Sequence, residues 1–296
     1  MKPEHLYQPA RLLRRLLHKG SRTSPTALTS FGMALDVMPD ELISNSIRRK
    51  GIYDLVTAEV IYRLLDPGAH ALDVGAHVGL MSAVMALRVG ADGQVQCFEP
   101  HPAVYAKLRA NAERMNQSLG NEVMQARNLA LSDSARHAPL FLPEDWAANT
   151  GVARLDSAAR NSASKSALGP VMVECQTLDD ACVSPTPKLM APDLMKIDVE
   201  GHELAVLRGA PQTLAKLRDI VFEDFGSYPT PVMSLLEQDG FSVFALYRTL
   251  HRPLLVEPQR PGVPKDADPN YLATRDPERA RRRFATAGWN VLRSLL

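Results

Sequence analysis

The amino-acid sequence predicts an α/β protein built on a doubly wound parallel sheet. From Gly51 onward, short apolar runs alternate with segments of helical periodicity, at a spacing typical of right-handed β–α–β crossovers. The first apolar run continues into the glycine-containing turn "DVGAHVG", and the second ends at an acidic residue, Glu99. In an open parallel sheet such turns and strand ends lie at one edge, where ligands bind.

The first half of the predicted domain follows this alternation closely. A helix over residues 53–65 ends at "DPGAH", where proline and glycine stop it. Pro102 stands in the first turn of a later helix, where its missing N–H is least harmful. The predicted strands are 71–74, 94–100 and 122–131, and the helices between them are 79–90 and 101–115.

Beyond Ser132 the alternation stops, and it returns later. Residues 132–192 are predicted to be an insertion rich in Ala, Ser and Pro, with one strand at 171–178. After it, the expected strands are 193–199, 219–225, 241–247 and 270–275, with helices at 201–217 and 231–240. The expected organisation is an N-terminal helical extension and linker (1–50), a main domain (51–275) and a C-terminal helix (276–296).

Composition and charge exclude several classes of protein. The formal net charge is +1 over 296 residues, which differs from the basic surface of a dedicated nucleic-acid binder. The three cysteines form no C-x-x-C pair, so we expect neither a zinc site nor disulfides, and we expect a reducing, cytoplasmic setting. No run approaches about 18 apolar residues, and the N-terminus lacks a signal-peptide pattern, so no membrane span is expected.

The N-terminal sequence predicts an amphipathic helix. Residues 10–20, "ARLLRRLLHKG", place four leucines on one face and basic residues around it. Such a face packs against its own domain or against a second subunit, or it lies on a membrane surface. A homo-oligomer and a peripheral membrane contact are therefore both compatible with the sequence.

The turn after the first strand discriminates between two nucleoside cofactors. Gly75 lets the backbone approach a ligand, and Glu99 stands where two ribose hydroxyls can donate to it. The dinucleotide fingerprint G-x-G-x-x-G is absent because Ala76 and His77 interrupt it. Asp73 would repel a pyrophosphate but suits the ammonium and sulfonium groups of S-adenosylmethionine. The pattern favours S-adenosylmethionine over NAD, and an ordinary β–α turn without a ligand is the alternative.

A set of motifs follows in order along residues 51–247. They are "LLDPGAHALDVGAHVGLMSA", "CFEPHPAVYAKLRAN", "NLALSD", "VECQTLDDA", "PDLMKIDVEGHELAVLRGA", "IVFEDF" and "LLEQDGFSVFAL". In this order they resemble the FkbM family of S-adenosylmethionine-dependent methyltransferases. Two local departures are His77, where the family often has Asn, and "FEDFG", which differs from a more usual hydrophobic–Glu ending near the expected substrate site.

The resemblance implies a fold, a cofactor and a reaction. The fold would be that of a class I methyltransferase (Rossmann-like), with a doubly wound, mostly parallel sheet and one antiparallel strand near its edge. The implied cofactor site has Asp73, Gly75 and Gly79 along the methionine part, Glu99 at the ribose, and Asn128 and Ala130 near the adenine, and Ala76 of the same turn also binds the cofactor. The family is associated with O-methylation, often of sugars or polyketide hydroxyls.

Methylation of a hydroxyl needs a group that takes up the proton, because an alcohol has a high pKa. The stretch "MKIDVEGHE" puts Asp198 at a strand end and Glu200 and His202 in the turn after it, while Glu223 ends the next strand. His202 or Asp198 could be the general base. Asp198, Glu200 and Glu223 or Asp224 could instead hold Mg²⁺, which we do not favour. The structural alternatives are a helix-capping acid at Glu200 and an exposed histidine at His202.

We therefore expect an S-adenosylmethionine-dependent O-methyltransferase that acts on a hydroxyl of a sugar or another small-molecule or natural-product acceptor, and not on nucleic acid. In the insertion, Trp146, Asn149 and Thr150 suit either sugar binding or a loop packed over the sheet. The alternative functions are methylation of an amine or a macromolecule, a non-catalytic binding protein that keeps the cofactor fold, and a nicotinamide-dependent oxidoreductase.

Overall fold

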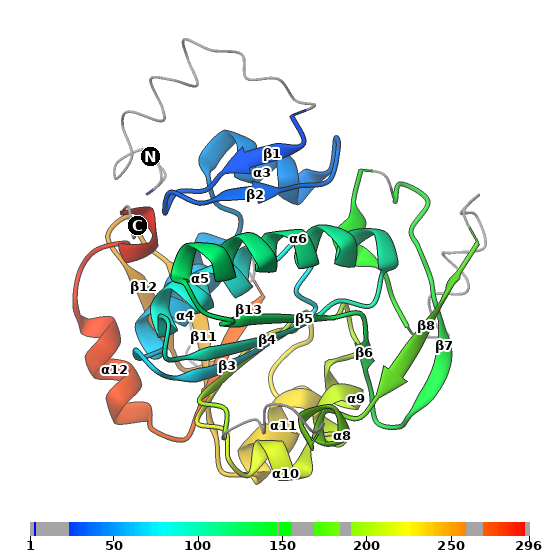
Figure 1. Cartoon of the computed structure of the whole chain (residues 1–296). Coiled ribbons are helices and arrows are strands. Elements are labelled where there is room, and N and C mark those ends of the chain that lie inside the picture. Colours follow the sequence, from blue (N-terminus) through cyan, green and yellow to red (C-terminus); the bar gives the residue numbers. More distant parts are fainter. Residues whose placement is uncertain are drawn as a thin grey trace.

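A computed structural model describes Pro3 and residues 24–146, 148–155, 169–183, 191–258 and 269–293 of the chain (Figure 1). The amphipathic helix predicted over residues 10–20 lies outside the described residues. Among the described helices, none combines the length and the apolar character that crossing a membrane requires. Cys97, Cys175 and Cys182 are all free thiols.

The centre of the molecule is an eight-stranded sheet. Its strands are β3 (His70–Val74), β4 (Gln94–Phe98), β5 (Met124–Arg127), β9 (Leu194–Ile197), β10 (Asp219–Glu223), β11 (Ser242–Arg248), β12 (Pro253–Val256) and β13 (Asn270–Thr274). They lie in the order β12-β11-β13-β10-β9-β3-β4-β5. The run from β10 to β5 is parallel, whereas β13 is antiparallel to both β10 and β11. This sheet confirms the predicted class I methyltransferase fold, with β12 as an additional antiparallel strand at the edge.

Helices cover both faces of the sheet, as Figure 1 shows. The helices on one face are α4 (Leu55–Leu64), α5 (Leu80–Val89) and α6 (Pro102–Leu119), and those on the other are α8 (Leu178–Val183), α9 (Glu203–Arg208), α10 (Pro211–Leu214) and α11 (Pro231–Gln238). Successive strand residues point to opposite faces. Ala71 therefore belongs to the core beneath α4–α6, and Leu72 belongs to the core beneath α9–α11. The chain reverses its winding at β3, which places a ligand-binding crevice between β3 and β9.

Three predicted elements differ from the structure. The helix expected over 201–217 is two helices, because Pro211 has no N–H to continue α9 and begins α10 instead. The strand expected over 122–131 divides into β5 and β6 (Ala130–Leu131), which leaves the central sheet. The C-terminal helix expected over 276–296 is α12, which ends at Ala285 and is followed by a 3₁₀ turn at Asn290–Leu292.

The insertion and the N-terminal region both contain strands that the sequence analysis did not predict. In the insertion, β7 (Arg136–Leu140) pairs with β8 (Val171–Gln176) and completes a three-stranded sheet with β6. The N-terminal region expected to be a helical extension and linker has a hairpin, β1 (Thr26–Leu28) and β2 (Ala34–Asp36), before its helix α3 (Leu42–Lys50). Glu41 caps α3 by accepting from Ile43 N and Ser44 N.

A buried ion pair fastens the C-terminal segment to α4. Arg63 donates to Glu59 over 2.8 Å, and both side chains are almost fully inaccessible to solvent. The Arg63 guanidinium also donates to the carbonyl oxygens of Arg283, Thr286 and Gly288. The segment after α12 is thereby held against the helix that precedes β3.

Candidate active site

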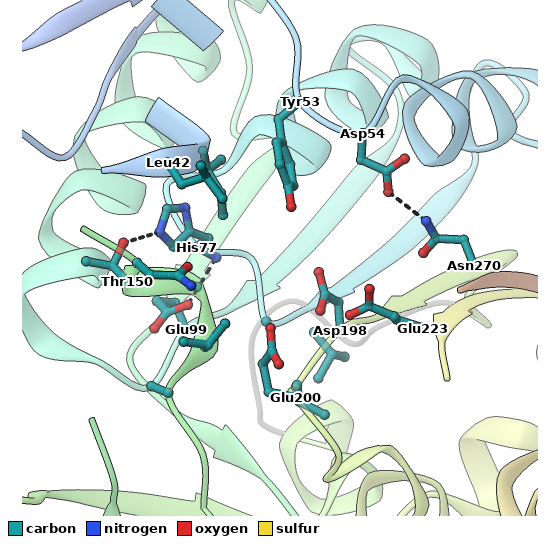
Figure 2. A pocket seen from close by; sticks show the side chains of 18 of the residues that line it. Leu42, Tyr53, Asp54, His77, Glu99, Thr150, Asp198, Glu200, Glu223 and Asn270 are labelled. Atoms are coloured by element: carbon teal, nitrogen blue, oxygen red, sulfur yellow. Dashed lines mark hydrogen bonds between the residues drawn. The ribbon is translucent and has the colours of Figure 1, made fainter. Parts of the chain in front are cut away.

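A cavity of about 880 Å³ opens at the carboxyl ends of β3, β4, β9 and β10 (Figure 2). Helix α3 and residues 149–155 of the insertion form further parts of its wall. The cavity therefore lies at the winding reversal of the sheet, where the sequence pattern predicted a ligand.

The turn after β3 comes very close to the turn after β9. Gly75 has a φ of +76°, and a Cβ at this position would stand 1.9 Å from the carbonyl oxygen of Asp198. Only glycine satisfies both the backbone angle and this approach. The N–H groups of Gly75 and Ala76 both donate to the carbonyl oxygen of Phe98, at 3.0 and 2.9 Å. The turn is thus held between two strands, and Gly75 lines the cavity.

Asp73 lies beneath this turn and does not line the large cavity. Its side chain is fully buried, and it accepts from Ser82 Oγ over 2.5 Å. Lys196, its register partner on β9, places its Nζ 3.4 Å from Asp73 Oδ1. Lys196 Nζ also donates to the carbonyl oxygen of Gly75 over 2.8 Å. Asp73 therefore holds the lysine that supports the turn.

Glu99 lines the cavity and is oriented by the backbone. Its two carboxylate oxygens accept from His77 N over 3.0 Å and from His101 N over 2.9 Å. Each oxygen keeps a lone pair for a further donor. Burial raises the pKa of Glu99 to about 7, against the opposing effect of the two backbone N–H groups.

The other predicted cofactor residues occupy different positions. Ala130 lines the cavity, whereas Asn128 does not and instead donates to the carbonyl oxygens of Glu99 and Pro100. Gly79, with a φ of +89°, is the N-cap of α5, and a Cβ there would meet Leu108. These residues shape the backbone around Glu99 and the turn.

Three carboxylates meet at the cavity floor. Asp198 and Glu200 follow β9, Glu223 ends β10, and one oxygen of each lies within 4.8 Å of the others. Asp198 forms an ion pair with Lys196, whose Nζ lies 3.4 Å from Oδ2. Burial first, and then the charge of Asp198, raises the pKa of Glu200 to about 7 and that of Glu223 to about 8.

The carboxylates have the donor type that Mg²⁺ prefers, so this set could hold a divalent cation. Lys196 already supplies a positive charge at Asp198, however, and its Nζ also binds the neighbouring turn. A second cation at Asp198 would be repelled by this ammonium group. The donor set therefore fits a metal only in part.

His202 lies outside the cavity lining. Its Nε2 is 2.9 Å from Ser132 Oγ, and the residue precedes α9 as its N-cap. Glu203, its neighbour, accepts from the N–H groups of Val199 and Gly201 and closes the turn. His202 therefore takes no part in the mechanism proposed below.

The insertion is attached to the glycine turn through a contact between His77 of the turn and Thr150 of the insertion. His77 has a φ of +51°, and its Nε2 lies 2.7 Å from Thr150 Oγ1. Asn149 and Thr150 both line the cavity. Trp146 is buried against His101, with ring centroids 4.4 Å apart, as expected of a loop packed over the sheet.

The residues of the cavity wall that the sequence analysis missed include Tyr53, Asp54 and Asn270. Asp54 caps α4 by accepting from Thr57 N over 3.1 Å, and Asn270 Nδ2 donates to its other oxygen over 3.2 Å. An acidic residue just before a helix was a recognisable cap signal. Asn270 and Asp54 are 216 residues apart in the sequence, and no sequence pattern linked them.

Comparison with known proteins gives the following similarities. A model of the methyltransferase FkbM domain matches residues 73–243. The chain is 29% identical over 223 residues to methyltransferase sdnD of Sordaria araneosa, covering 67% of this chain and 84% of that protein. It is 28% identical over 175 residues to 2-O-methyltransferase NoeI of Sinorhizobium fredii, covering 57% and 68%. It is 29% identical over 171 residues to hexuronic acid methyltransferase AglP of Haloferax volcanii, covering 57% and 62%.

Proposed function

Because this chain belongs to the FkbM family of methyltransferases, we propose that it transfers the methyl group of S-adenosylmethionine to a hydroxyl of a sugar or of a similar small hydroxylated acceptor. The names of two relatives support this acceptor: one is a 2-O-methyltransferase, which transfers to an oxygen, and the other is a hexuronic acid methyltransferase, which acts on a sugar acid. The observation that carries the proposal is the acidic cavity floor beside the glycine turn.

The residues around the turn suit the cofactor. Glu99 would accept from the ribose hydroxyls, because its oxygens are fixed by backbone N–H groups and face the cavity. The backbone of Gly75 and the side chain of Ala130 would form the wall on either side. S-adenosylmethionine, when bound, supplies an electrophilic methyl group on a sulfonium centre, and the carboxylates of the floor favour that positive charge.

In the proposed mechanism, Glu223 is the general base. It has no ion-pair partner within the described residues, whereas Asp198 pairs with Lys196 and Glu200 with Arg154. The acceptor oxygen forms its bond to the methyl carbon as the carbon–sulfur bond breaks, and the hydroxyl proton passes to a carboxylate oxygen of Glu223. A base with a pKa near the working pH is best suited to this transfer. Asp198, paired with Lys196, would orient the same hydroxyl.

Calorimetric titration with S-adenosylmethionine tests the cofactor, with NAD as the control ligand. We expect binding by the wild-type chain, and a Kd about 10–100 times higher for Glu99→Gln, since a hydrogen bond to a charged group is lost. Glu122→Gln, an exposed glutamate away from the cavity, should leave the Kd unchanged. A folded wild-type protein that binds NAD, or that fails to bind S-adenosylmethionine, would contradict the proposal.

A further inference from the structure

Two segments outside the family-matching region complete the cavity. The matching region spans residues 73–243, whereas Tyr53 and Asp54 precede it and Asn270 follows it. All three line the cavity, and they also line a recess of about 60 Å³ that shares Asp198 and Glu223 with it. They therefore form a wall next to the carboxylates that would receive the acceptor's proton.

Tyr53 stands across the cavity from the three carboxylates. Figure 2 shows its hydroxyl pointing into the space that Asp198 and Glu223 face. Within the described part of the chain, this hydroxyl has no hydrogen-bond partner, and the residue is 38% exposed. Burial and the neighbouring carboxylates raise the pKa of Tyr53 to about 12, so it remains a hydrogen-bond donor.

Asp54 and Asn270 form a polar pair beside the base. Asn270 is the register partner of Glu223 in the pairing of β10 with β13, so the two side chains start from adjacent positions of the sheet. Its Nδ2 donates to Asp54 Oδ2 over 3.2 Å, as the dashed line in Figure 2 marks. Asp54 is held in a left-handed conformation, φ +43°, as the cap of α4. The pair offers an amide and a carboxylate at a fixed place.

An exposed aromatic ring adds an apolar surface. Phe225 is the second residue after β10, lines the cavity and is 74% exposed. The aromatic face can pack against the C–H groups of a ligand ring, and the amide and carboxylate groups can form hydrogen bonds with hydroxyls at the edge of that ring.

From this arrangement we propose that Tyr53, Asp54 and Asn270 form an acceptor subsite for a ring with two neighbouring hydroxyls. The reactive hydroxyl lies between Glu223 and the Tyr53 hydroxyl, and the adjacent hydroxyl exchanges hydrogen bonds with the Asp54–Asn270 pair. The Tyr53 phenol donates to the reactive oxygen and positions it. This inference rests on the proposed function, which it narrows to vicinal diols.

The test measures S-adenosylhomocysteine formation by the full chain with methyl glycosides of hexoses, 6-deoxyhexoses and hexuronic acids. Each accepted glycoside is compared with its analogue that lacks the hydroxyl next to the methylated one. For wild type, we expect kcat/KM to fall at least tenfold with the deoxy analogue, because the polar pair loses its partner. Asn270→Ala should lower kcat/KM for the diol by a similar factor, mainly through KM, and should leave the deoxy analogue unaffected.

Tyr53→Phe should lower kcat for both compounds, because it removes the donor to the reactive oxygen. The matched controls are Asn121→Ala and Tyr105→Phe, which lie outside the cavity lining. Calorimetry should show unchanged S-adenosylmethionine binding in every variant. If Asn270→Ala does not fold, Asp54→Asn tests the same pair while keeping a capping residue.

Three results would overturn the subsite: equal losses for diol and deoxy compounds in Asn270→Ala, full activity in both variants, or weakened cofactor binding. A different result concerns the proposed function. If wild type binds S-adenosylmethionine but methylates no glycoside, the sugar acceptor is wrong, and the ligand class assigned to this subsite is wrong with it.

Discussion

At the scale of single residues, Glu223 differs electrostatically from the two carboxylates beside it. Asp198 lies 3.4 Å from an ammonium group and Glu200 lies 3.6 Å from a guanidinium group. Glu223 has only negative neighbours among the charges that shift its pKa: Asp198, Glu200, Asp54 and Glu203. Its ionised form is therefore the one that the fold disfavours, which makes it the best proton acceptor of the three.

The pH dependence of the reaction should reflect the ionisation of Glu223. Glu223 must be ionised to act as a base, and its pKa is raised to about 8. We expect kcat/KM for the acceptor to rise as the pH increases from about 6, to reach half its maximum near pH 8 and to level off above about pH 9. Glu223→Gln should lower kcat by a factor of about 100–10,000 and remove the rise. A flat profile in wild type, or near-normal turnover by the variant, would assign the proton to another group.

The site residues were predictable where strand position alone decides their place. Asp198, Glu200 and Glu223 follow the ends of neighbouring parallel strands, so their proximity could be inferred. The orientation of the Asp73 side chain could not be inferred. It depends on Lys196 of the neighbouring strand, and the sequence does not reveal which residues of β3 and β9 lie opposite each other. His202 was equally ambiguous, since its partner Ser132 comes from a distant turn.

At the scale of elements, the contact between the turns after β3 and β9 should be sensitive to one methyl group. Gly75→Ala places a Cβ against the Asp198 carbonyl, whereas Gly68→Ala, at nearly the same φ (+77°), meets nothing within 4 Å. The left-handed conformation alone destabilises each alanine variant by about 1–2 kcal/mol.

We expect Gly68→Ala to lose only that stability and to keep its affinity for S-adenosylmethionine. Gly75→Ala should lose more stability and most of that affinity, because the two turns are forced apart. Thermal unfolding and calorimetry on both variants measure the two effects. Equal behaviour of the pair would mean that the close approach has no role in the site.

Element prediction succeeded where hydrophobic periodicity was strong. The alternating helices and strands from α4 to α6 agree with the sequence analysis because each buries apolar side chains at a regular spacing. Strands β1, β2 and β7 are short and partly exposed, and they gain stability from their partners rather than from their own composition. Their pairing is non-local information that a single segment does not contain.

At the scale of the whole molecule, the Arg63–Glu59 pair connects the two ends of the domain. Arg63→Met would leave Glu59 buried without its cation and would release three carbonyl oxygens of the C-terminal segment. Breaking a buried pair in this way destabilises by about 3–5 kcal/mol. We expect Tm to fall by on the order of 10 °C.

The matched control is Arg109→Ala, which breaks an ion pair whose arginine is 64% exposed. Exposed pairs contribute about 0–1 kcal/mol, so Tm should hardly change. Equal Tm values for Arg63→Met and wild type would show that the C-terminal segment is held by packing alone.

The place of β13 in the sheet has a consequence for synthesis on the ribosome. β13 lies between β10 and β11, although both are translated before it. Until Asn270–Thr274 leaves the exit tunnel, β10 and β11 each present an open edge, and such edges pair readily with other chains. A nascent chain that stalls before this point would be a substrate for chaperones and a seed for aggregation, so the segment translated after β11 decides whether the earlier residues are recovered as folded protein.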